Sequence, residues 1–256
     1  MKLNFKKFGK GKPFIIIHGL FGSSDNWIPI AKKLSNQYTV YIPDLRNHGD
    51  NEHTKDFNFN VLSNDLIEFI DSNKIEKPII LGHSLGGRIA MHLAFEYPNC
   101  LNKLIIVDVA PKIYNKKFLY PHIFILKLFN SINISNYNSI TSVKNLLYEE
   151  YNLSEITVNL FLKNIKRTNK QFEWKINSKS ILDNIEIMFG EEYKYSVFNK
   201  PTLIIKGQKS DYIKNEDKIL INKYFINNTF LEIKDCSHWV HSEKPEELIK
   251  IINSFL

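Results

Sequence analysis

Ser84 stands in a sequence context that favours a nucleophile. It is the middle residue of Gly82-His83-Ser84-Leu85-Gly86, a Gly-x-Ser-x-Gly pattern between the apolar run PIIL and the helix-like segment LGGRIAMHLAFEYP. At a sharp turn from strand to helix, a serine has strained backbone angles and an exposed hydroxyl, and glycines beside it avoid collisions. A turn that merely contains a serine is the weaker interpretation. A phosphate-binding loop is weaker still, because Gly87-Arg88-Ile89 lacks the required Gly-Lys-Ser/Thr.

A serine nucleophile needs a base, and a histidine late in the chain could supply it. An alcohol reacts poorly at neutral pH unless a neighbouring group accepts its proton. His238 lies in KDCSHWVHSEKP, after the last expected strand, in a loop that returns to the edge of the sheet beside Ser84. His241 is the competitor, but it lies nearer the start of the next helix, where a packing or capping role is more ordinary. We therefore expect His238 to be the base.

Two aspartates compete to orient His238. Asp108 ends the apolar strand LIIV, so its carboxylate would face the same crevice as Ser84. Asp211 lies in KGQKSDY, directly after the later apolar strand PTLIIKG. Both keep the order Ser, Asp, His, and local hydrogen bonding in a turn is the alternative role for each. Either could hold the imidazole and stabilise its protonated form.

Acyl transfer, the chemistry that these groups suit, also needs hydrogen-bond donors for the developing oxyanion. The segment HGLFGSS follows an expected buried strand and can present main-chain N–H groups, as can the residue after Ser84. We expect the backbone N–H groups of Leu20 and Leu85 to form this site. An ordinary turn is the competing interpretation of His18-Gly19.

One further polar cluster contains residue types that can bind a metal. His48 and His53 flank Asp50 and Glu52 in RNHGDNEH, but their spacing fits no common zinc motif. We therefore expect an exposed polar loop there and no metal.

The elements that must position these residues alternate between strands and helices. The strand-sized runs are continuously apolar and rich in isoleucine rather than alternating between apolar and polar residues, which is typical of parallel strands buried on both faces. The expected fold is therefore α/β, with a mostly parallel central sheet and helices on both faces. The runs are FIII, YTVYIP, PIIL, LIIV and PTLIIKG.

This alternation breaks between residues 112 and 196. Helix-like aromatic and Asn-rich segments such as FLYPHIFILKLFNSI and EITVNLFLKNIKR replace it, with no glycine before Gly190. We expect a core formed by residues 1–111 and 197–256 and an inserted helical lid formed by residues 112–196.

Charge and composition argue against several classes of protein. The net charge of +7 arises from scattered lysines with no nucleic-acid-binding motif, so we expect no nucleic-acid partner. The apolar runs are too short for a membrane span, and the first ends after four residues, which is too short for a signal peptide. Two isolated cysteines suggest no disulfide, and we expect a cytoplasmic protein. The sequence does not predict whether the protein is a monomer or a dimer.

The segments HGLFGSSDNW, PDLRNHG, GHSLGG, VDVAP, FEWKIN and SHWVHSEKP together resemble the α/β-hydrolase fold family, in particular its small acyl esterases of the YbfF type. The resemblance implies a hydrolase of short-chain or acyl-CoA-like esters and thioesters, with no metal and no organic cofactor, and it favours Asp108 as the acid. Two departures would alter the rim of the pocket. Cys236-Ser237 replaces a Gly-rich pair, and residues 49–52 lack the usual small residues and proline.

The expected function is hydrolysis of a small-molecule ester or thioester through an acyl-enzyme on Ser84, with His238 as base. Acyltransferase, perhydrolase and C–C hydrolase activities are rival hypotheses, because they use nearly the same groups. A non-catalytic receptor for a small molecule is another hypothesis, and a membrane-surface lipase is the last. The lipase interpretation rests only on FLYPHIFILKLF.

Overall fold

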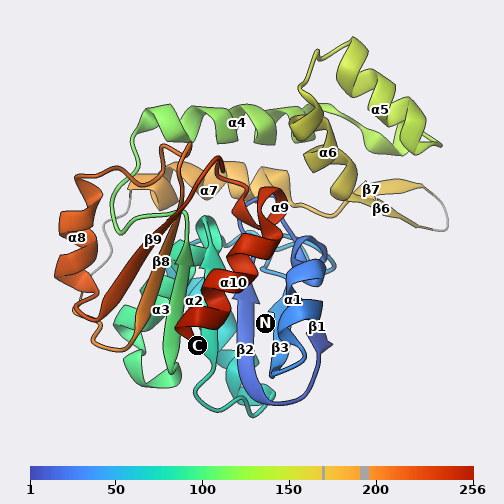
Figure 1. The fold of residues 1–256 in the computed structure, drawn as a ribbon. Helices are drawn as coiled ribbons and strands as arrows, with labels where there is room; N and C mark the ends of the chain where they lie inside the picture. The colour runs from blue at the N-terminus through green and yellow to red at the C-terminus, as the bar shows by residue number, and fades with distance from the viewer. Residues whose placement is uncertain (169–170, 191–195) are drawn as a thin grey trace.

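A seven-stranded sheet forms the centre of the computed structural model, which describes residues 1–168, 171–190 and 196–256 (Figure 1). The strand order is β1-β3-β2-β4-β5-β8-β9; β1 pairs antiparallel with β3, and the other pairs are parallel. This is the mostly parallel sheet that the apolar runs predict. The strands are β1 (Phe5–Phe8), β2 (Lys12–Ile17), β3 (Tyr38–Pro43), β4 (Ile79–His83), β5 (Lys103–Val107), β8 (Thr202–Gly207) and β9 (Asn228–Ile233).

Helices cover both faces of the sheet and explain why the strands are apolar throughout. Successive side chains of a strand point to opposite faces. Phe14 and Ile16 of β2 pack with apolar residues of α1 and α10, whereas Ile15 and Ile17 pack with those of α2, α3 and α8. The core helices are α1 (Ile28–Leu34), α2 (Phe59–Ser72), α3 (Leu85–Glu96), α8 (Asp217–Tyr224), α9 (Val240–Glu243) and α10 (Pro245–Phe255), with short 3-10 turns η1 (Ser24–Trp27) and η2 (Pro98–Cys100).

Between β5 and β8 the chain leaves the sheet and forms a layer above it, which we call the insertion (residues 112–196, of which 169–170 and 191–195 are outside the described residues) (Figure 1). Helices α4 and α7 lie side by side over the sheet, and α5 and α6 project to one side. A two-stranded hairpin was not expected from the sequence. The elements are α4 (Lys116–Ser131), η3 (Ile134–Asn136), α5 (Ile140–Glu149), α6 (Glu155–Lys163), β6 (Ile165–Arg167), β7 (Phe172–Trp174) and α7 (Ser178–Gly190).

The register of the central strands determines where the polar residues emerge. His83, the last residue of β4, pairs with Val107, the last residue of β5. Ser84 and Asp108, which directly follow β4 and β5, therefore leave the sheet at the same level, at the edge that faces the insertion.

Two further expectations can be checked on the described residues. None of their helices is both long enough and apolar enough to cross a membrane. Cys100 and Cys236 are both free.

Candidate active site

Ser84 occupies the strained turn that its sequence context predicts. Its φ of 54° and ψ of −117° lie outside the ordinary regions for a residue with a side chain, at a cost of about 1–3 kcal/mol. A Cβ atom on Gly82 would lie 2.3 Å from the carbonyl oxygen of Gly86, and one on Gly86 would lie 2.3 Å from that of Ile17. The two glycines therefore permit strand, turn and helix to approach each other closely enough for this geometry.

His238 reaches Ser84 from the loop between β9 and α9. Its Nε2 lies 2.9 Å from Ser84 Oγ, and its Nδ1 lies 2.7 Å from Asp108 Oδ2. A carboxylate can only accept a hydrogen bond, so the proton of a neutral imidazole belongs on Nδ1. The other nitrogen, Nε2, then carries the lone pair that can accept the hydroxyl proton of Ser84.

Asp108 is fully buried, and hydrogen bonds satisfy its carboxylate. Besides the bond from His238, the backbone N–H of Gly207 donates to Oδ1 over 3.0 Å, and the hydroxyl of Ser210 donates to Oδ2. A buried carboxylate needs such partners, because each unmet hydrogen bond is costly away from water. These donors hold the carboxylate in a fixed position behind the imidazole.

Asp211, the second candidate aspartate, is not part of this group. Its side chain is about two-thirds exposed, and its Oδ2 lies 3.2 Å from Lys117 Nζ in an ion pair at the surface. After β8 the chain turns so that Ser210, not Asp211, faces Asp108. The structure therefore brings one of the two candidate aspartates to His238, and Asp211 is corrected to a surface residue.

His241, the competitor of His238, is a packed residue. Its ring stacks on Trp27 with centroids 4.5 Å apart and lies near the ring of His83. Burial lowers the pKa of His241 to about 4. It therefore stays neutral at neutral pH, and its Nδ1 has no hydrogen-bond partner among the described residues.

Leu20 and Leu85, whose backbone N–H groups are the expected oxyanion donors, both lie beside Ser84. Leu85 is the first residue of α3, whose first N–H groups have no acceptor within the helix. The loop after β2 passes close to the nucleophile, since a Cβ on Gly19 would lie 3.3 Å from the Cβ of Ser84. Within the described residues, neither of the two N–H groups donates a backbone or side-chain hydrogen bond. Their role as oxyanion donors remains a prediction.

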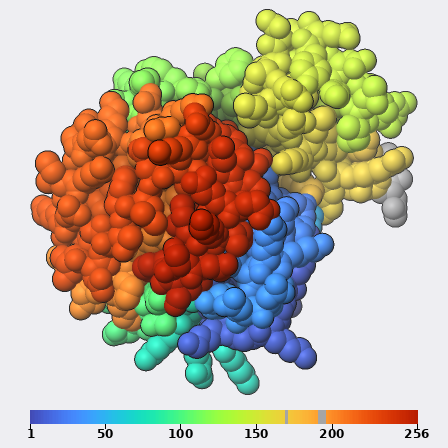
Figure 2. Space-filling view, in the orientation of Figure 1, coloured from blue at the N-terminus to red at the C-terminus, as the bar shows by residue number. Residues whose placement is uncertain are grey.

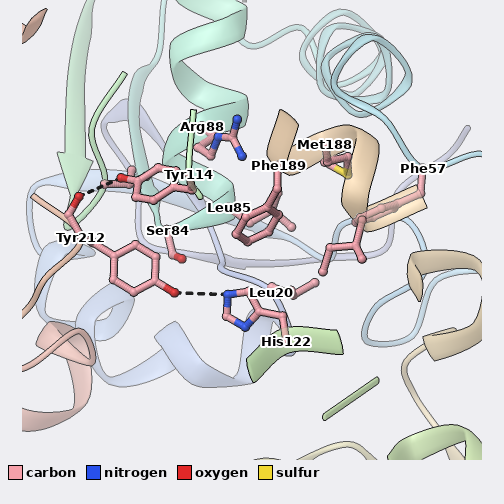
Figure 3. A pocket seen from close by; sticks show the side chains of 12 residues that line it. Leu20, Phe57, Ser84, Leu85, Arg88, Tyr114, His122, Met188, Phe189 and Tyr212 are labelled. Carbon is pink, nitrogen blue, oxygen red and sulfur yellow. Dashed lines mark hydrogen bonds between the residues drawn. The ribbon is translucent and has the colours of Figure 1, made fainter. Parts of the chain in front are cut away.

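A pocket opens beside the Ser84 hydroxyl under α4 and α7, and we call it the inner pocket (Figure 3). Its walls are mostly apolar and aromatic, and its cation is Arg88, whose guanidinium lies 4.8 Å from the centroid of the Phe59 ring. The lining residues are Leu20, Phe57, Ser84, Leu85, Arg88, Val109, Tyr114, His122, Ile185, Met188, Phe189 and Tyr212.

The structure adds residues that the sequence did not single out. The ring of Tyr212 stacks on His238, with centroids 3.9 Å apart and an angle of 14° between the planes. Its hydroxyl lies 3.2 Å from Nε2 of His122, which α4 contributes (Figure 3). Burial raises the pKa of Tyr212 to about 12 and lowers that of His122 to about 4. The only signal in the sequence was that Ser210 and Tyr212 flank Asp211.

His83 supports the base from behind. It is neutral because burial keeps its pKa well below the usual value, and its Nε2 lies 2.9 Å from the carbonyl oxygen of His238. The imidazole N–H can therefore donate to that carbonyl and hold the loop that carries His238.

The cluster in RNHGDNEH differs from the exposed polar loop that the sequence predicted. His48 is fully buried, and its ring packs against that of His18 with centroids 5.3 Å apart. In contrast, Asp50 and His53 are exposed. No group of three or more His, Cys, Asp or Glu side chains suited to a metal ion occurs among the described residues.

Comparison with known proteins agrees with this geometry. Residues 12–245 match the alpha/beta hydrolase fold family. A putative esterase/lipase of Haemophilus influenzae is 35% identical over 245 residues, which are 94% of this chain and 82% of that protein. Esterase YbfF of Escherichia coli is 28% identical over 261 residues, covering 100% of this chain and 99% of its own length.

The same similarity extends to a solved structure. A marine microorganism esterase is 36% identical and superposes with a TM-score of 0.94, covering 100% of this chain and 99% of that one. The chain therefore belongs to the alpha/beta hydrolase fold family, and its predicted resemblance to the YbfF-type members is confirmed.

Proposed function

We propose that this esterase-type alpha/beta hydrolase cleaves carboxylic esters or thioesters through an acyl-enzyme on Ser84. The observation that carries the proposal is the line of hydrogen bonds from Ser84 Oγ to His238 (2.9 Å) and from His238 to Asp108 (2.7 Å). Three polar groups in this order match the arrangement that activates a serine for attack on an acyl carbon. The similarity to proteins named as esterases supports the same reaction.

In the first step, Ser84 Oγ forms a bond to the acyl carbon while His238 Nε2 takes the hydroxyl proton. The imidazole becomes positively charged, and the carboxylate of Asp108, 2.7 Å from Nδ1, stabilises that charge. Asp108 itself does not accept a proton in this scheme. Its hydrogen bonds from Gly207 and Ser210 serve to hold it in place.

The carbonyl oxygen gains negative charge as the tetrahedral intermediate forms. The N–H groups of Leu20 and Leu85 donate hydrogen bonds to it, and the N-terminus of α3 adds a favourable dipole. Donors of this kind contribute about 3–4 kcal/mol each to lowering the barrier.

The intermediate then collapses, and the bond from the acyl carbon to the leaving oxygen or sulfur breaks. His238 gives its proton to the leaving group and next accepts a proton from water, which attacks the acyl-enzyme. The products are the carboxylic acid and the free alcohol or thiol, and Ser84 recovers its proton. No oxidant or reductant is needed, because these steps transfer only protons and the acyl group.

Hydrolysis of p-nitrophenyl butyrate tests the proposal. Ser84→Ala and His238→Ala should each lower kcat by at least about 10⁴-fold, since the members of such a group act as a unit. Ser254→Ala, which changes an exposed serine on α10, is the matched control and should retain the full rate. Unchanged hydrolysis by Ser84→Ala or by His238→Ala would exclude the mechanism.

The same assay separates the rival functions. A non-catalytic receptor of this fold would show no hydrolysis that depends on Ser84. An acyltransferase would form ethyl butyrate in preference to butyric acid when ethanol is added, because the alcohol would replace water in the second step. We expect butyric acid to remain the main product.

A further inference from the structure

We infer that Ser84 lies between two binding spaces of unequal size, and that the substrate places a short acyl group in the smaller space and a long leaving group in the larger one. The inference rests on the proposed function and extends it to the substrate class. It predicts short-chain acyl esters or thioesters of long alcohols or thiols.

Two cavities meet at the nucleophile. The inner pocket and a second cavity, which we call the outer channel, share Leu20, Ser84 and His122 in their walls. The inner pocket extends under α7, where Ile185, Met188 and Phe189 close it. The outer channel extends the opposite way, between the core and α6, and its walls include Ile156, Leu160, His238 and Trp239.

The position of His238 decides which part of the substrate enters which space. His238 Nε2 must protonate the leaving oxygen or sulfur, so that atom has to lie within hydrogen-bonding distance of it. His238 lines the outer channel but is absent from the described residues that line the inner pocket. The leaving group therefore departs into the outer channel, and the acyl chain extends in the opposite direction.

The sizes of the two spaces differ several-fold. The inner pocket has a free volume of about 30 Å³ and the outer channel one of about 180 Å³. Beyond the channel lies a cavity of about 430 Å³, which shares Phe21, Ile156, Leu160 and Trp239 with it. The inner pocket thus accommodates only a short acyl chain, whereas on the opposite side the outer channel adjoins this larger cavity, and we call the two together the outer groove.

The wall of this groove indicates the chemistry of the leaving group. Near Ser84 it is formed mostly by apolar and aromatic side chains, whereas the outer cavity adds the polar Asn26, Asn159 and Ser242 and the charged Lys163 and Glu243. Figure 2 shows this face, where the yellow surface of α6 meets the red surface of the C-terminal segment. A leaving group with an apolar stem, able to form hydrogen bonds at its far end, matches this sequence of surfaces.

Two isomeric esters test the inference on the unmodified protein. Octyl acetate and ethyl octanoate contain the same atoms and differ only in which side of the ester carries the long chain. We expect kcat/KM to be at least tenfold higher for octyl acetate, because excluding even one methylene from a tight pocket changes rates by about tenfold or more. Equal values, or a preference for ethyl octanoate, would overturn the inference.

Variants of the two walls identify the cause of the preference. Met188→Ala enlarges the inner pocket, and Leu160→Trp fills part of the outer channel; each should shift the ratio of the two rates toward ethyl octanoate by several-fold. Ile226→Ala changes an exposed residue that lines neither the inner pocket nor the outer channel and should leave the ratio unchanged. If the ratio stays the same in both wall variants, the assignment of the acyl chain to the inner pocket and of the leaving group to the outer channel is contradicted. If a variant fails to fold, the comparison of the two isomers on the unmodified protein still tests the assignment.

Ethyl acetate, which is short on both sides, and the Ser84→Ala variant separate this inference from the proposed function. Hydrolysis that depends on Ser84 but favours ethyl octanoate would reject the inference and leave the function intact. If no ester of the three is hydrolysed in a Ser84-dependent way, the proposed function fails, and the inference fails with it.

Discussion

The different surroundings of Asp108 and Asp211 explain why the first can orient His238 and the second cannot. Asp108 follows β5, the neighbour of β4, and leaves the sheet at the level of Ser84. Asp211 follows β8, one strand further away, and its side chain points to solvent beside Lys117. Ser210 also follows β8 and reaches Asp108, so the course of the loop after β8, rather than the position of the strand, turns Asp211 away from the imidazole.

Substitution of the two aspartates should separate them clearly. Asp108→Asn keeps the size of the side chain but loses the charge that stabilises the imidazolium and fixes its tautomer, so kcat for p-nitrophenyl butyrate should fall by about 10³–10⁴-fold. Asp211→Asn changes only an exposed ion pair and should keep the rate within about twofold. A full loss in Asp211→Asn with no effect in Asp108→Asn would reverse the assignment.

The same residues show what the sequence could and could not provide. Ser84 was recognisable because the features that position it, two glycines and a strand-to-helix junction, lie within a few residues of it. The choice between Asp108 and Asp211 remained open, because both follow apolar strands and the order of strands in a sheet is not written in the local sequence. Tyr212 has only the weak signal that it flanks Asp211, since its stacking on His238 brings together the loop after β8 and the loop after β9.

At the scale of elements, the site depends on the close packing of α3 against the end of β2. Gly86 is the point of contact, because the carbonyl oxygens of Ile17 and His18 approach it directly. This contact brings the loop that carries Leu20 to the N-terminus of α3. The two expected oxyanion donors therefore depend on one helix–strand contact.

Enlarging that point of contact should damage both stability and activity. The added Cβ of Gly86→Ala would lie 2.3 Å from the oxygen of Ile17, so α3 must shift, and the free energy of unfolding in urea should fall by about 1–3 kcal/mol. The kcat should fall as well, because the shift moves Leu85 relative to Leu20. Gly190→Ala is the control and should be neutral, because no atom of the described residues lies within 4 Å of the added Cβ. Equal stability of both variants would contradict this view of the packing.

The motif RNHG acquires a structural meaning from the contacts of its side chains. Asn47 donates to the hydroxyl of Ser180 over 3.2 Å, and its backbone carbonyl accepts from the N–H of Asn177 over 2.9 Å. Arg46 binds both carboxylate oxygens of Asp65 on α2. Asn47 therefore attaches the insertion to the core, whereas Arg46 fixes its own loop to α2 within the core. The sequence could not reveal this, because Asn47 and the start of α7 lie 130 positions apart.

At the scale of the whole molecule, the alternation of strands and helices and the motifs spread along the chain were sufficient to predict the fold family. The helical character of the insertion was visible too, but not its hairpin, whose strands have only three residues each. The relative sizes of the inner pocket and the outer channel depend on how α4, α6 and α7 lie over the sheet. No local pattern encodes such a placement, so the substrate could be expected only in broad terms.

Buried histidines should make the stability of the whole molecule depend on pH. Burial lowers the pKa of His18 and His241 to about 4 and that of His48 to about 3, whereas an unfolded chain has values near 6.5. Between about pH 6.5 and 4 the unfolded chain therefore binds protons that the folded protein does not. Acidification through this range favours unfolding, and the stabilisation that is present above pH 6.5 is lost as the pH falls.

Urea unfolding at pH 7.5 and pH 5.0 measures this effect. Each of the three histidines should contribute about 1–2 kcal/mol to the loss of unfolding free energy between the two pH values. His241→Phe keeps an aromatic ring against Trp27 but removes one titrating group, so its loss between the two pH values should be smaller than that of the unmodified protein by about one such contribution. Comparing losses rather than absolute stabilities cancels any packing change that the substitution causes at both pH values. Equal losses in the two proteins would mean that His241 is not held neutral by burial.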